Sequence, residues 1–435
     1  MKHMTATVHA PTPPYSLRDT GLELVMCQDI MLKTMFRQNL TSVSEIAESL
    51  SVLPPVAQEL IELARGSNLV ETLGARGASP SAQLRYQMTE TGRARAMDAL
   101  EQSEYFGALP VTLEAFKEQT KRQSIRDVTI TRDRLEASME NLILPEGMLD
   151  QLGPAVSSGK SMLLYGPPGN GKSSISNGIR DALGDRVFVP RCIEYAGQVI
   201  SVYDPIVHSE AQTNEDELNA LRRSSVHDPQ YVLCRRPTVM TGGELTLDML
   251  DLNYNKVSKT YQAPLQLKAT GGVFIVDDLG RQQESPQSLI NRWIVPMENG
   301  IDILSLQSGQ KFVVPFDTLV IFSTNFAPAE LFDGAALRRI SYKVLVDGPS
   351  RDEFIKIFLL ICKLKKIRPT EEVMAHLLAK KYPTVNNKFA SYHAPFLIDQ
   401  MTAICEYEQR EKEMTPELID RAWENLFVAD RTIEK

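Results

Sequence analysis

The chain contains, at residues 162–173, the sequence MLLYGPPGNGKS. Its first four residues predict a short buried strand, and the remainder matches the pattern G-x-x-x-x-G-K-[ST] ahead of a helix that begins at Ser174. Glycines let such a loop curl so that its N–H groups point inward at a helix N-terminus, where anions are favoured. The stretch therefore predicts a phosphate-binding loop. Its predicted binding residues are Gly166, Pro167, Pro168, Gly169, Asn170, Gly171, Lys172, Ser173 and Ser174.

Two side chains of this loop have specific predicted roles. Lys172 is placed to reach the terminal phosphates of a nucleotide, and the hydroxyl of Ser173 is placed to bind Mg²⁺. A chance match to a glycine-rich turn is the alternative. The strand before the loop and the helix after it favour the binding site.

Two later apolar runs end in polar side chains. VFIV (273–276) is followed by Asp277 and Asp278, and LVIF (319–322) is followed by Ser323, Thr324 and Asn325. Ligands of parallel α/β sheets bind at the carboxyl ends of the strands. We therefore expect Asp277 to bind Mg²⁺, Asp278 to activate the attacking water, and Asn325 to position that water. Two solvated carboxylates at a strand end are the alternative.

An arginine pair, Arg338 and Arg339, follows within the sequence ALRRI (336–340). Such a pair is usually a solvated helix face. An arginine that reaches a terminal phosphate, however, stabilises the charge that spreads over its oxygens during phosphoryl transfer.

Taken together, these motifs resemble those of the AAA+ ATPase family. GPPGNGKS resembles its Walker A motif, VFIVDD its Walker B motif, Asn325 its sensor 1, and ALRRI its arginine-finger segment. The resemblance implies an α/β fold with a parallel sheet between helices, followed by an all-helical lid. It also implies Mg²⁺-dependent ATP hydrolysis in a homo-oligomeric ring, usually a hexamer. Arg338 or Arg339 would then act on the nucleotide of the next subunit.

A finer resemblance concerns residues 300–317, which predict a β-hairpin between a helix and the strand that ends at Asn325. This hairpin is similar to the pre-sensor-1 hairpin of MoxR-type ATPases and of bacterial enhancer-binding activators. The GAFTGA loop of those activators is absent, so their role is not assigned to this chain.

The sequence departs from the family pattern at two places. Asp278 stands where the family usually has Glu, which implies slower hydrolysis or a differently placed water. The segment expected to carry a sensor 2 arginine has none. His393 and Lys388 are the open candidates there, and a structural role is favoured for His393.

The rest of the chain predicts further domains. Residues 16–105 resemble a winged helix-turn-helix, with helices, a strand at 69–73, a wing at 74–81, a strand at 84–88 and a last helix. The predicted boundaries are a flexible tail (1–15), the winged-helix-like domain (16–105), a linker (106–131), the large α/β domain (132–347) and the helical lid (348–435).

Composition limits the possible functions. The chain has 435 residues, 43% hydrophobic and 23% charged, with a net charge of −8, which suits a soluble globular protein and excludes a chain-wide cationic surface. No apolar run approaches the roughly 18 residues that span a bilayer. Five dispersed cysteines without a CxxC pair, and a start without an apolar segment, predict a cytoplasmic protein.

The sequence says less about which molecule the protein binds as a partner. The stretch 16–103 carries 8 basic and 11 acidic side chains, a net charge of −3, which favours docking of a protein over binding of DNA. Residues 191–201 predict a hairpin in which Tyr195 faces either a ring pore or, as we favour, its own sheet. Residues 209–220 predict a polar surface loop. The favoured hypothesis is an ATP-driven ring motor that remodels or moves a protein partner. The alternatives are a DNA-acting or transcription-linked ATPase and a slowly hydrolysing ATP-dependent assembly switch.

Overall fold

The structure is a computed structural model that describes residues 9–75, 84–211 and 227–427. The chain divides into two compact units, each assembled from separate stretches. The first comprises residues 1–128, 184–274 and 288–319, and the second comprises residues 129–183, 275–287 and 320–435.

The first unit begins with helices followed by a two-stranded antiparallel sheet and another helix. The elements are α1 (Leu24–Gln38), α2 (Val43–Leu50), α3 (Pro54–Gly66), β1 (Val70–Ala75), β2 (Leu84–Met88) and α4 (Glu90–Gln102). A capping box starts α2: Ser42 Oγ accepts a hydrogen bond from the Glu45 N–H, and the Glu45 carboxylate accepts one from the Ser42 N–H. Ile46, Leu60 and Ile61 lie in the buried core. The predicted order of helices and strands is thus confirmed, whereas most of the predicted wing lies outside the described residues.

The rest of the first unit is mainly β-structure. A five-stranded sheet has the order β10-β11-β7-β6-β3, and two pairs of strands stand beside it, β5–β8 and β13–β14. The bounds are β3 (Val111–Thr112), β5 (Arg186–Pro190), β6 (Cys192–Tyr195), β7 (Gln198–Ser201), β8 (Tyr231–Arg235), β10 (Asn253–Asn255), β11 (Thr260–Gln262), β13 (Ile301–Ser305) and β14 (Lys311–Pro315). The helices are α5 (Leu113–Arg122), α10 (Leu265–Lys268) and most of α11 (Pro286–Asn299).

Both predicted hairpins are present in this unit. β6 and β7 are antiparallel, and their turn, Ala196-Gly197, has positive φ values of 51° and 75°. β13 and β14 are antiparallel between α11 and the next strand, where the sequence predicts them. Alternation along β13 and β14 buries Leu304, Phe312 and Val314.

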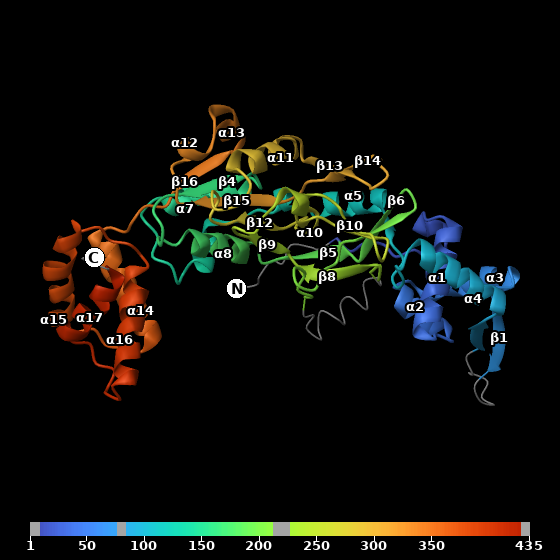
Figure 1. The fold of residues 1–435 in the computed structure, drawn as a ribbon, viewed down its shortest axis with the longest axis horizontal. Helices are drawn as coiled ribbons and strands as arrows, with labels where there is room; N and C mark the ends of the chain where they lie inside the picture. Colours follow the sequence, from blue (N-terminus) through green and yellow to red (C-terminus); the bar gives the residue numbers. More distant parts are fainter. Residues whose placement is uncertain (1–8, 76–83, 212–226, 428–435) are drawn as a thin grey trace, which may run out of the picture. The chain divides into compact units, whose positions relative to one another are not determined.

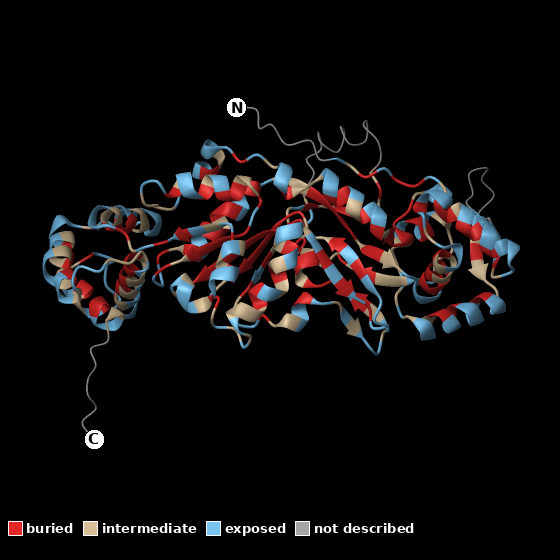
Figure 2. Ribbon diagram, turned by 90° about the horizontal axis from the view of Figure 1, so that it is seen from above, coloured by how far each residue is buried: buried red, intermediate tan, exposed pale blue. Residues whose placement is uncertain are grey.

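A second five-stranded sheet holds the motifs, in the order β16-β4-β15-β12-β9 (Figure 1). Its strands are β4 (Met162–Tyr165), β9 (Thr238–Thr241), β12 (Val273–Val276), β15 (Leu319–Thr324) and β16 (Tyr342–Leu345). β4 is parallel to both of its neighbours, so the carboxyl ends of these three strands share one edge. β12 and β15 are buried throughout, and Figure 2 shows buried residues following the strands while the helices carry exposed residues on their outer sides. This is the predicted α/β fold.

The second unit also contains helices that surround the motif strands. They are α6 (Arg132–Ser138), α7 (Met148–Ser157), α8 (Lys172–Leu183), α12 (Pro328–Leu331) and α13 (Gly334–Arg339). α8 directly follows the loop after β4, as predicted. Gly178 of α8 lies close to Met139, because a Cβ built on this glycine would come 2.7 Å from the methionine side chain.

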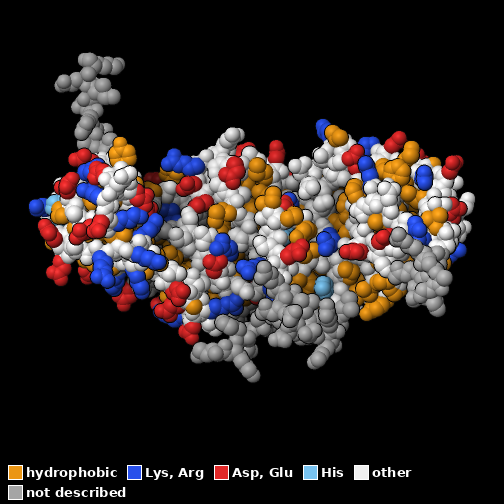
Figure 3. Space-filling view, turned by 90° about the horizontal axis from the view of Figure 1, so that it is seen from below, with side chains coloured by type: hydrophobic (Ala, Val, Ile, Leu, Met, Phe, Trp, Pro, Cys, Tyr) orange, Lys and Arg blue, Asp and Glu red, His pale blue; other side chains and the backbone are white. Residues whose placement is uncertain are grey.

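The C-terminal part of the second unit is entirely helical from residue 351 to the end of the described residues. Its helices are α14 (Arg351–Lys365), α15 (Glu371–His376), the short turns η4 (Leu377–Lys381) and η5 (Tyr382–Val385), α16 (His393–Tyr407) and α17 (Pro416–Leu426). Ser350 and Glu353 form a capping box at the start of α14. Phe354, Phe358 and Tyr382 are fully buried in the core of this helical lid. Figure 3 shows basic and acidic side chains interspersed over its visible face.

Two predictions about connecting segments are wrong. The segment 106–131, predicted as a linker, forms β3 and α5, and α5 packs against β3, β6 and β14. Within the predicted flexible tail, residues 10–14 are packed rather than loose: the Asp228 N–H donates to Pro11 O at 3.0 Å, and Gln119 Nε2 donates to His9 O at 2.8 Å. Prolines that carry no N–H to satisfy can be buried in this way at little cost.

Two further points complete the fold. The predicted surface loop at 209–220 lies, beyond residue 211, outside the described residues. Among the helices of the described ranges, none has the length and apolar character that a bilayer crossing requires.

Candidate functional site

The loop between β4 and α8 has a backbone that only glycine adopts readily. Gly166, Gly169 and Gly171 have φ values of 139°, 77° and 89°. Residues with a Cβ rarely adopt these angles. At position 166 the space for a side chain is restricted as well, because a Cβ there would lie 2.4 Å from Val346 O. The predicted glycines therefore allow the loop to form a tight turn at the N-terminus of α8.

Lys172 is folded back over this loop. Its side chain is buried, and its Nζ donates hydrogen bonds to Gly166 O and Pro167 O, both at 2.9 Å. Burial lowers the pKa of Lys172, and the nearby charges of Asp278 and Asp277 oppose that shift. A buried ammonium group that meets carbonyl oxygens is well placed to bind a multiply charged anion.

Ser173 and Asp277 meet at the start of α8. Ser173 Oγ donates to Asp277 Oδ2 at 2.8 Å, although 104 residues separate them in the sequence. A hydroxyl and a carboxylate are hard oxygen donors of the kind that Mg²⁺ prefers. The predicted pair of metal-binding side chains is thus brought together by the shared edge of the sheet.

Asp278 and Asn325 form a second pair at the same edge. Asn325 Nδ2 donates to Asp278 Oδ1 at 3.0 Å. Asp278 has a φ of 50°, a left-handed conformation that is uncommon for residues other than glycine and is often found at functional sites. The Asp278 N–H also donates to Asp277 Oδ1 at 3.1 Å, so both carboxylate oxygens of Asp277 accept hydrogen bonds.

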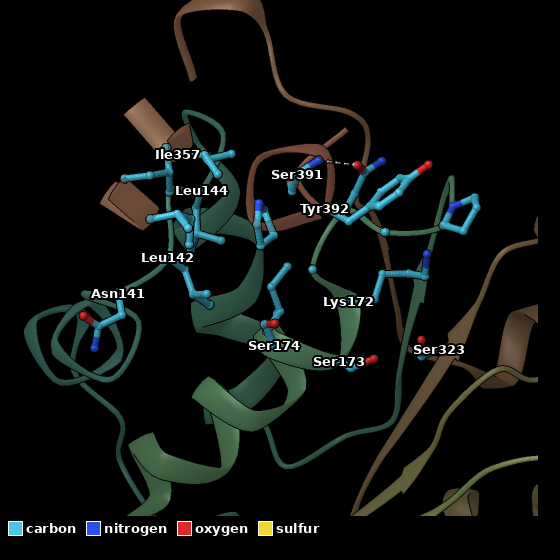
Figure 4. Close-up of a pocket in the computed structure, with 18 of the residues that line it drawn as sticks. Asn141, Leu142, Leu144, Lys172, Ser173, Ser174, Ser323, Ile357, Ser391 and Tyr392 are labelled. Carbon is cyan, nitrogen blue, oxygen red and sulfur yellow. Dashed lines mark hydrogen bonds between the residues drawn. The ribbon is translucent and has the colours of Figure 1, made fainter. Parts of the chain in front are cut away.

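All of these groups line one cavity of about 550 Å³ in the second unit, shown in Figure 4. Its polar end consists of the loop, Asp277, Asp278 and Asn325. Its other end is largely apolar and comes from two additional segments. The apolar lining residues are Leu142, Ile143, Leu144, Ile357, Leu360, Ile361, Tyr392 and Pro395. The cavity therefore has an end suited to phosphates and an end suited to a flat ring system.

The sequence did not identify the apolar end of the cavity. Ile357 and Ile361 lie on α14, and nothing in their spacing or in the run at 142–144 distinguishes a cavity wall from ordinary core. Tyr392 was not singled out either. These residues become part of the site only through tertiary packing, since the lid helix α14 and the turn before α16 lie beside the loop (Figure 4).

Two buried polar atoms at the cavity lack partners. Within the described residues, Asn170 Nδ2 and Ser323 Oγ make no hydrogen bond. A buried polar group without a partner costs about 1–3 kcal/mol. Both residues line the cavity, so a polar ligand or its water can satisfy them. The residues present therefore fit a bound nucleotide and its cation.

The arginine pair lies apart from this cavity. The described residues that line it include neither Arg338 nor Arg339, both of which belong to α13. Arg338 Nε donates to Gly334 O at 3.1 Å, and Arg339 Nη1 donates to Ala335 O at 2.8 Å. Within one chain the structure does not place them in the cavity that Lys172 lines.

The candidates for the sensor 2 position are also outside the cavity. His393 is buried, and its Nδ1 lies 3.0 Å from the Tyr382 hydroxyl, between the rings of Tyr392 and Phe427. Burial lowers the pKa of His393 to about 4, so it is neutral at pH 7. This environment supports the structural role. Lys388 is exposed and is not among the described lining residues.

Tyr195 packs within its own unit. Its ring stacks on Phe312 with centroids 4.3 Å apart, and its hydroxyl donates to Lys311 O at 3.4 Å. The side chain is thus held against the neighbouring β13–β14 hairpin, and not against the sheet to which its own strand β6 belongs, as the favoured prediction had it.

Comparisons with known proteins add little. A family model described as a domain of unknown function (DUF8689) matches residues 350–425. No curated protein matches the chain. NtrX from Brucella abortus in complex with ADP aligns at 13% identity over 80% of this chain and 69% of that chain, with a TM-score of 0.40. A point mutant of RuvB from Thermotoga maritima aligns at 12% identity over 72% of this chain and 76% of that chain, with a TM-score of 0.36. Similarity at this level assigns neither a family nor a function.

Proposed function

We propose that the chain binds ATP in this cavity and hydrolyses it. The observation that carries the proposal is the convergence of a buried lysine on a glycine loop, a serine–aspartate pair and an aspartate–asparagine pair at one end of a cavity with an apolar far end. The adenine ring would lie against the apolar residues, and the phosphates would lie in the loop. Ser173 and Asp277 would hold Mg²⁺, which, when bound, neutralises part of the phosphate charge.

The chain's own residues then have distinct tasks. Loop N–H groups and Lys172 bind the phosphate oxygens and orient the terminal phosphate. Asp278 accepts a proton from the attacking water, and Asn325, which already donates to Asp278, holds the carboxylate and the water in place. The apolar wall reduces competing water and strengthens the charge interactions.

We further propose an AAA+-like ring, as the motifs suggest. An arginine of one subunit can complete the site of its neighbour, and such a role is compatible with the finding that neither Arg338 nor Arg339 is among the described residues that line their own cavity. Residues 132–347 and 348–435 would form the ATPase, and residues 16–105 a winged-helix-like module that recruits a protein partner for remodelling.

A protein partner is favoured over DNA by the side chains of α3, the helix that would enter DNA. Glu59 accepts a hydrogen bond from the Leu17 N–H at 2.7 Å, and Glu62 pairs with Arg65 at 2.7 Å. These carboxylates would repel phosphates, which supply most of the affinity of a nonspecific DNA complex.

A slowly hydrolysing assembly switch is the second candidate. The shorter carboxylate of Asp278, its left-handed backbone and its hydrogen bond to Asn325 favour a restrained base. ATP-driven assembly with negligible turnover would distinguish the switch from the motor.

Calorimetry with ATP tests the proposed binding site. Lys172→Ala should abolish tight binding, because the charge that meets the terminal phosphates is lost. Lys160→Ala, which removes an exposed lysine just before β4, is the matched control and should bind as the wild type does. Equal affinity of the two variants would refute the assignment of the loop.

A further inference from the structure

The lid holds the tip of the phosphate-binding loop through two hydrogen bonds that adjacent backbone N–H groups of the lid donate. The Tyr392 N–H donates to Gly169 O at 2.9 Å, and the Ser391 N–H donates to Asn170 Oδ1 at 3.2 Å. The second bond is the dashed line in Figure 4. Consecutive residues of the turn before α16 therefore bind consecutive residues of the loop.

This contact is tight as well as polar. A Cβ built on Gly169 would lie 2.2 Å from Cδ1 of Tyr392, so the tyrosine ring packs directly on the glycine. Asn170 is 7% exposed. Little space remains for the loop tip to rotate while the lid is in place.

The geometry of one peptide group links this contact to the ligand. The Gly169 carbonyl and the Asn170 N–H belong to the same planar trans peptide, so they point in opposite directions. The lid binds the carbonyl end. In a loop that curls around phosphate, the N–H end faces the anion. An anion that fixes the N–H therefore also fixes the carbonyl towards Tyr392.

We propose that the Gly169–Asn170 peptide group couples nucleotide binding to docking of the lid, and that Tyr392 is a positioning residue which acts through its backbone N–H. The inference rests on the proposed nucleotide site. Among the described residues, no arginine of the lid lines the cavity. A backbone hydrogen bond, and not a charged side chain, would therefore connect the lid to the phosphate site.

The coupling has a definite sign. Hydrogen bonds at the two ends of one peptide polarise it in the same sense, so each strengthens the other. Nucleotide should therefore tighten the lid contact, and, because coupling between two binding events is reciprocal, the lid contact should raise nucleotide affinity by the same factor.

A matched pair of full-length variants isolates this hydrogen bond. Tyr392 has a φ of −70°, which proline also adopts, so Tyr392→Pro removes the N–H without demanding a new φ. Tyr392→Ala removes the same ring but keeps the N–H. We would measure calorimetric affinity for ADP and a non-hydrolysable ATP analogue, together with hydrogen exchange at the Ser391 amide with and without nucleotide.

The expected result is a difference between the two variants. Tyr392→Pro should bind nucleotide about threefold to tenfold more weakly than Tyr392→Ala, the scale of one net hydrogen bond. Nucleotide should slow exchange at Ser391 in the wild type and in Tyr392→Ala, and this slowing should disappear in Tyr392→Pro. Equal affinities, with equal exchange behaviour at Ser391, would overturn the coupling.

A second pair covers the case in which the proline variant does not fold. Asn170→Ala removes the acceptor of the Ser391 N–H, and Asn177→Ala on α8 is its control. Nucleotide-dependent protection at Ser391 should be lost in Asn170→Ala and kept in Asn177→Ala, and equal protection in both would overturn the inference. A wild type that binds nucleotide without any change at Ser391 would refute the coupling alone, whereas a wild type that binds no nucleotide would refute the proposed function beneath it.

Discussion

The carboxyl edge of the motif sheet and the N-terminal helices α1–α4 are both well packed, but they differ in how far they reveal a ligand. At the sheet edge, positive φ angles, a buried lysine and two polar side-chain pairs are the observations from which we propose an anionic ligand with a cation beside it. In α1–α4 the buried residues establish a core, and the exposed ones form no arrangement that points to one ligand. A site built from backbone conformation supports a proposal about the chemistry of its ligand, whereas a docking surface built from exposed side chains does not.

The largest expected effect tests whether the residues at the sheet edge of one chain are sufficient for ATP hydrolysis. Arg338→Ala/Arg339→Ala should lower ATP hydrolysis by about 10³-fold or more, the scale for loss of an arginine that stabilises the transition state, while leaving ATP affinity unchanged. Mixing this variant with Lys172→Ala should restore part of the activity, because each subunit supplies what the other lacks.

Steady-state ATPase assays of the mixtures measure this effect. Lys356→Ala/Lys363→Ala, two exposed lysines of α14, is the control and should retain wild-type turnover. Co-assembled mixtures that stay as inactive as either parent would exclude a role of the arginines in the neighbouring site.

The next effect separates binding from chemistry at the same edge. Asp278→Asn preserves size and shape but removes the base, so hydrolysis should fall by about 10²-fold or more while Mg²⁺ and ATP still bind. Single-turnover assays and calorimetry measure the two quantities, and Asp181→Asn on α8 serves as the control. Wild-type turnover in Asp278→Asn would show that another group activates the water.

A third prediction concerns a substitution in the N-terminal helices, which should leave the nucleotide site at the sheet edge intact. Leu60→Ala in α3 removes a fully buried side chain and should lower the free energy of unfolding of the N-terminal helices by about 2–5 kcal/mol. Leu63→Ala on the same helix truncates a side chain that is 38% exposed and should cost far less. Denaturant unfolding followed by probes in α1–α4 measures the difference. ATP affinity should stay within about twofold in both variants, and a larger loss would mean that the two regions are energetically coupled.

The smallest expected effect concerns DNA. The full chain should bind duplex DNA weakly and without sequence preference at physiological salt, and added DNA should not change ATPase turnover, because α3 is acidic. Fluorescence anisotropy with labelled duplexes measures the affinity. A specific nanomolar complex that is lost in Arg85→Ala would instead favour a DNA-acting ATPase.

The success of prediction from sequence followed the range of the interactions involved. β4, the start of α8, β12 and β15 were predicted because each is defined by a short apolar run and the residues next to it. Ser173 and Asp277 were placed together because parallel strands that end at one edge must bring their following residues close. The capping boxes at Ser42 and Ser350 are equally local, since each joins a serine to a glutamate three residues away.

Features that depend on long-range packing were missed. α5 was predicted as part of a linker because its polar composition hides the few residues, such as Phe116, that it buries. The packing of Pro11 depends on Asp228, far away in the sequence. Tyr392 belongs to the site only because a lid turn meets a loop more than two hundred residues earlier in the chain, and no local pattern encodes that meeting.

The contact between Gly169 and Tyr392 also has an evolutionary consequence. A Cβ at position 169 cannot coexist with an aromatic ring at 392 in the present backbone, since the two would be 2.2 Å apart. A Cβ at position 169 would also be strained by the φ of 77°, so a smaller residue at 392 would remove only one of two obstacles. Position 169 should therefore stay glycine while position 392 can change, and the constraint between loop and lid runs in one direction.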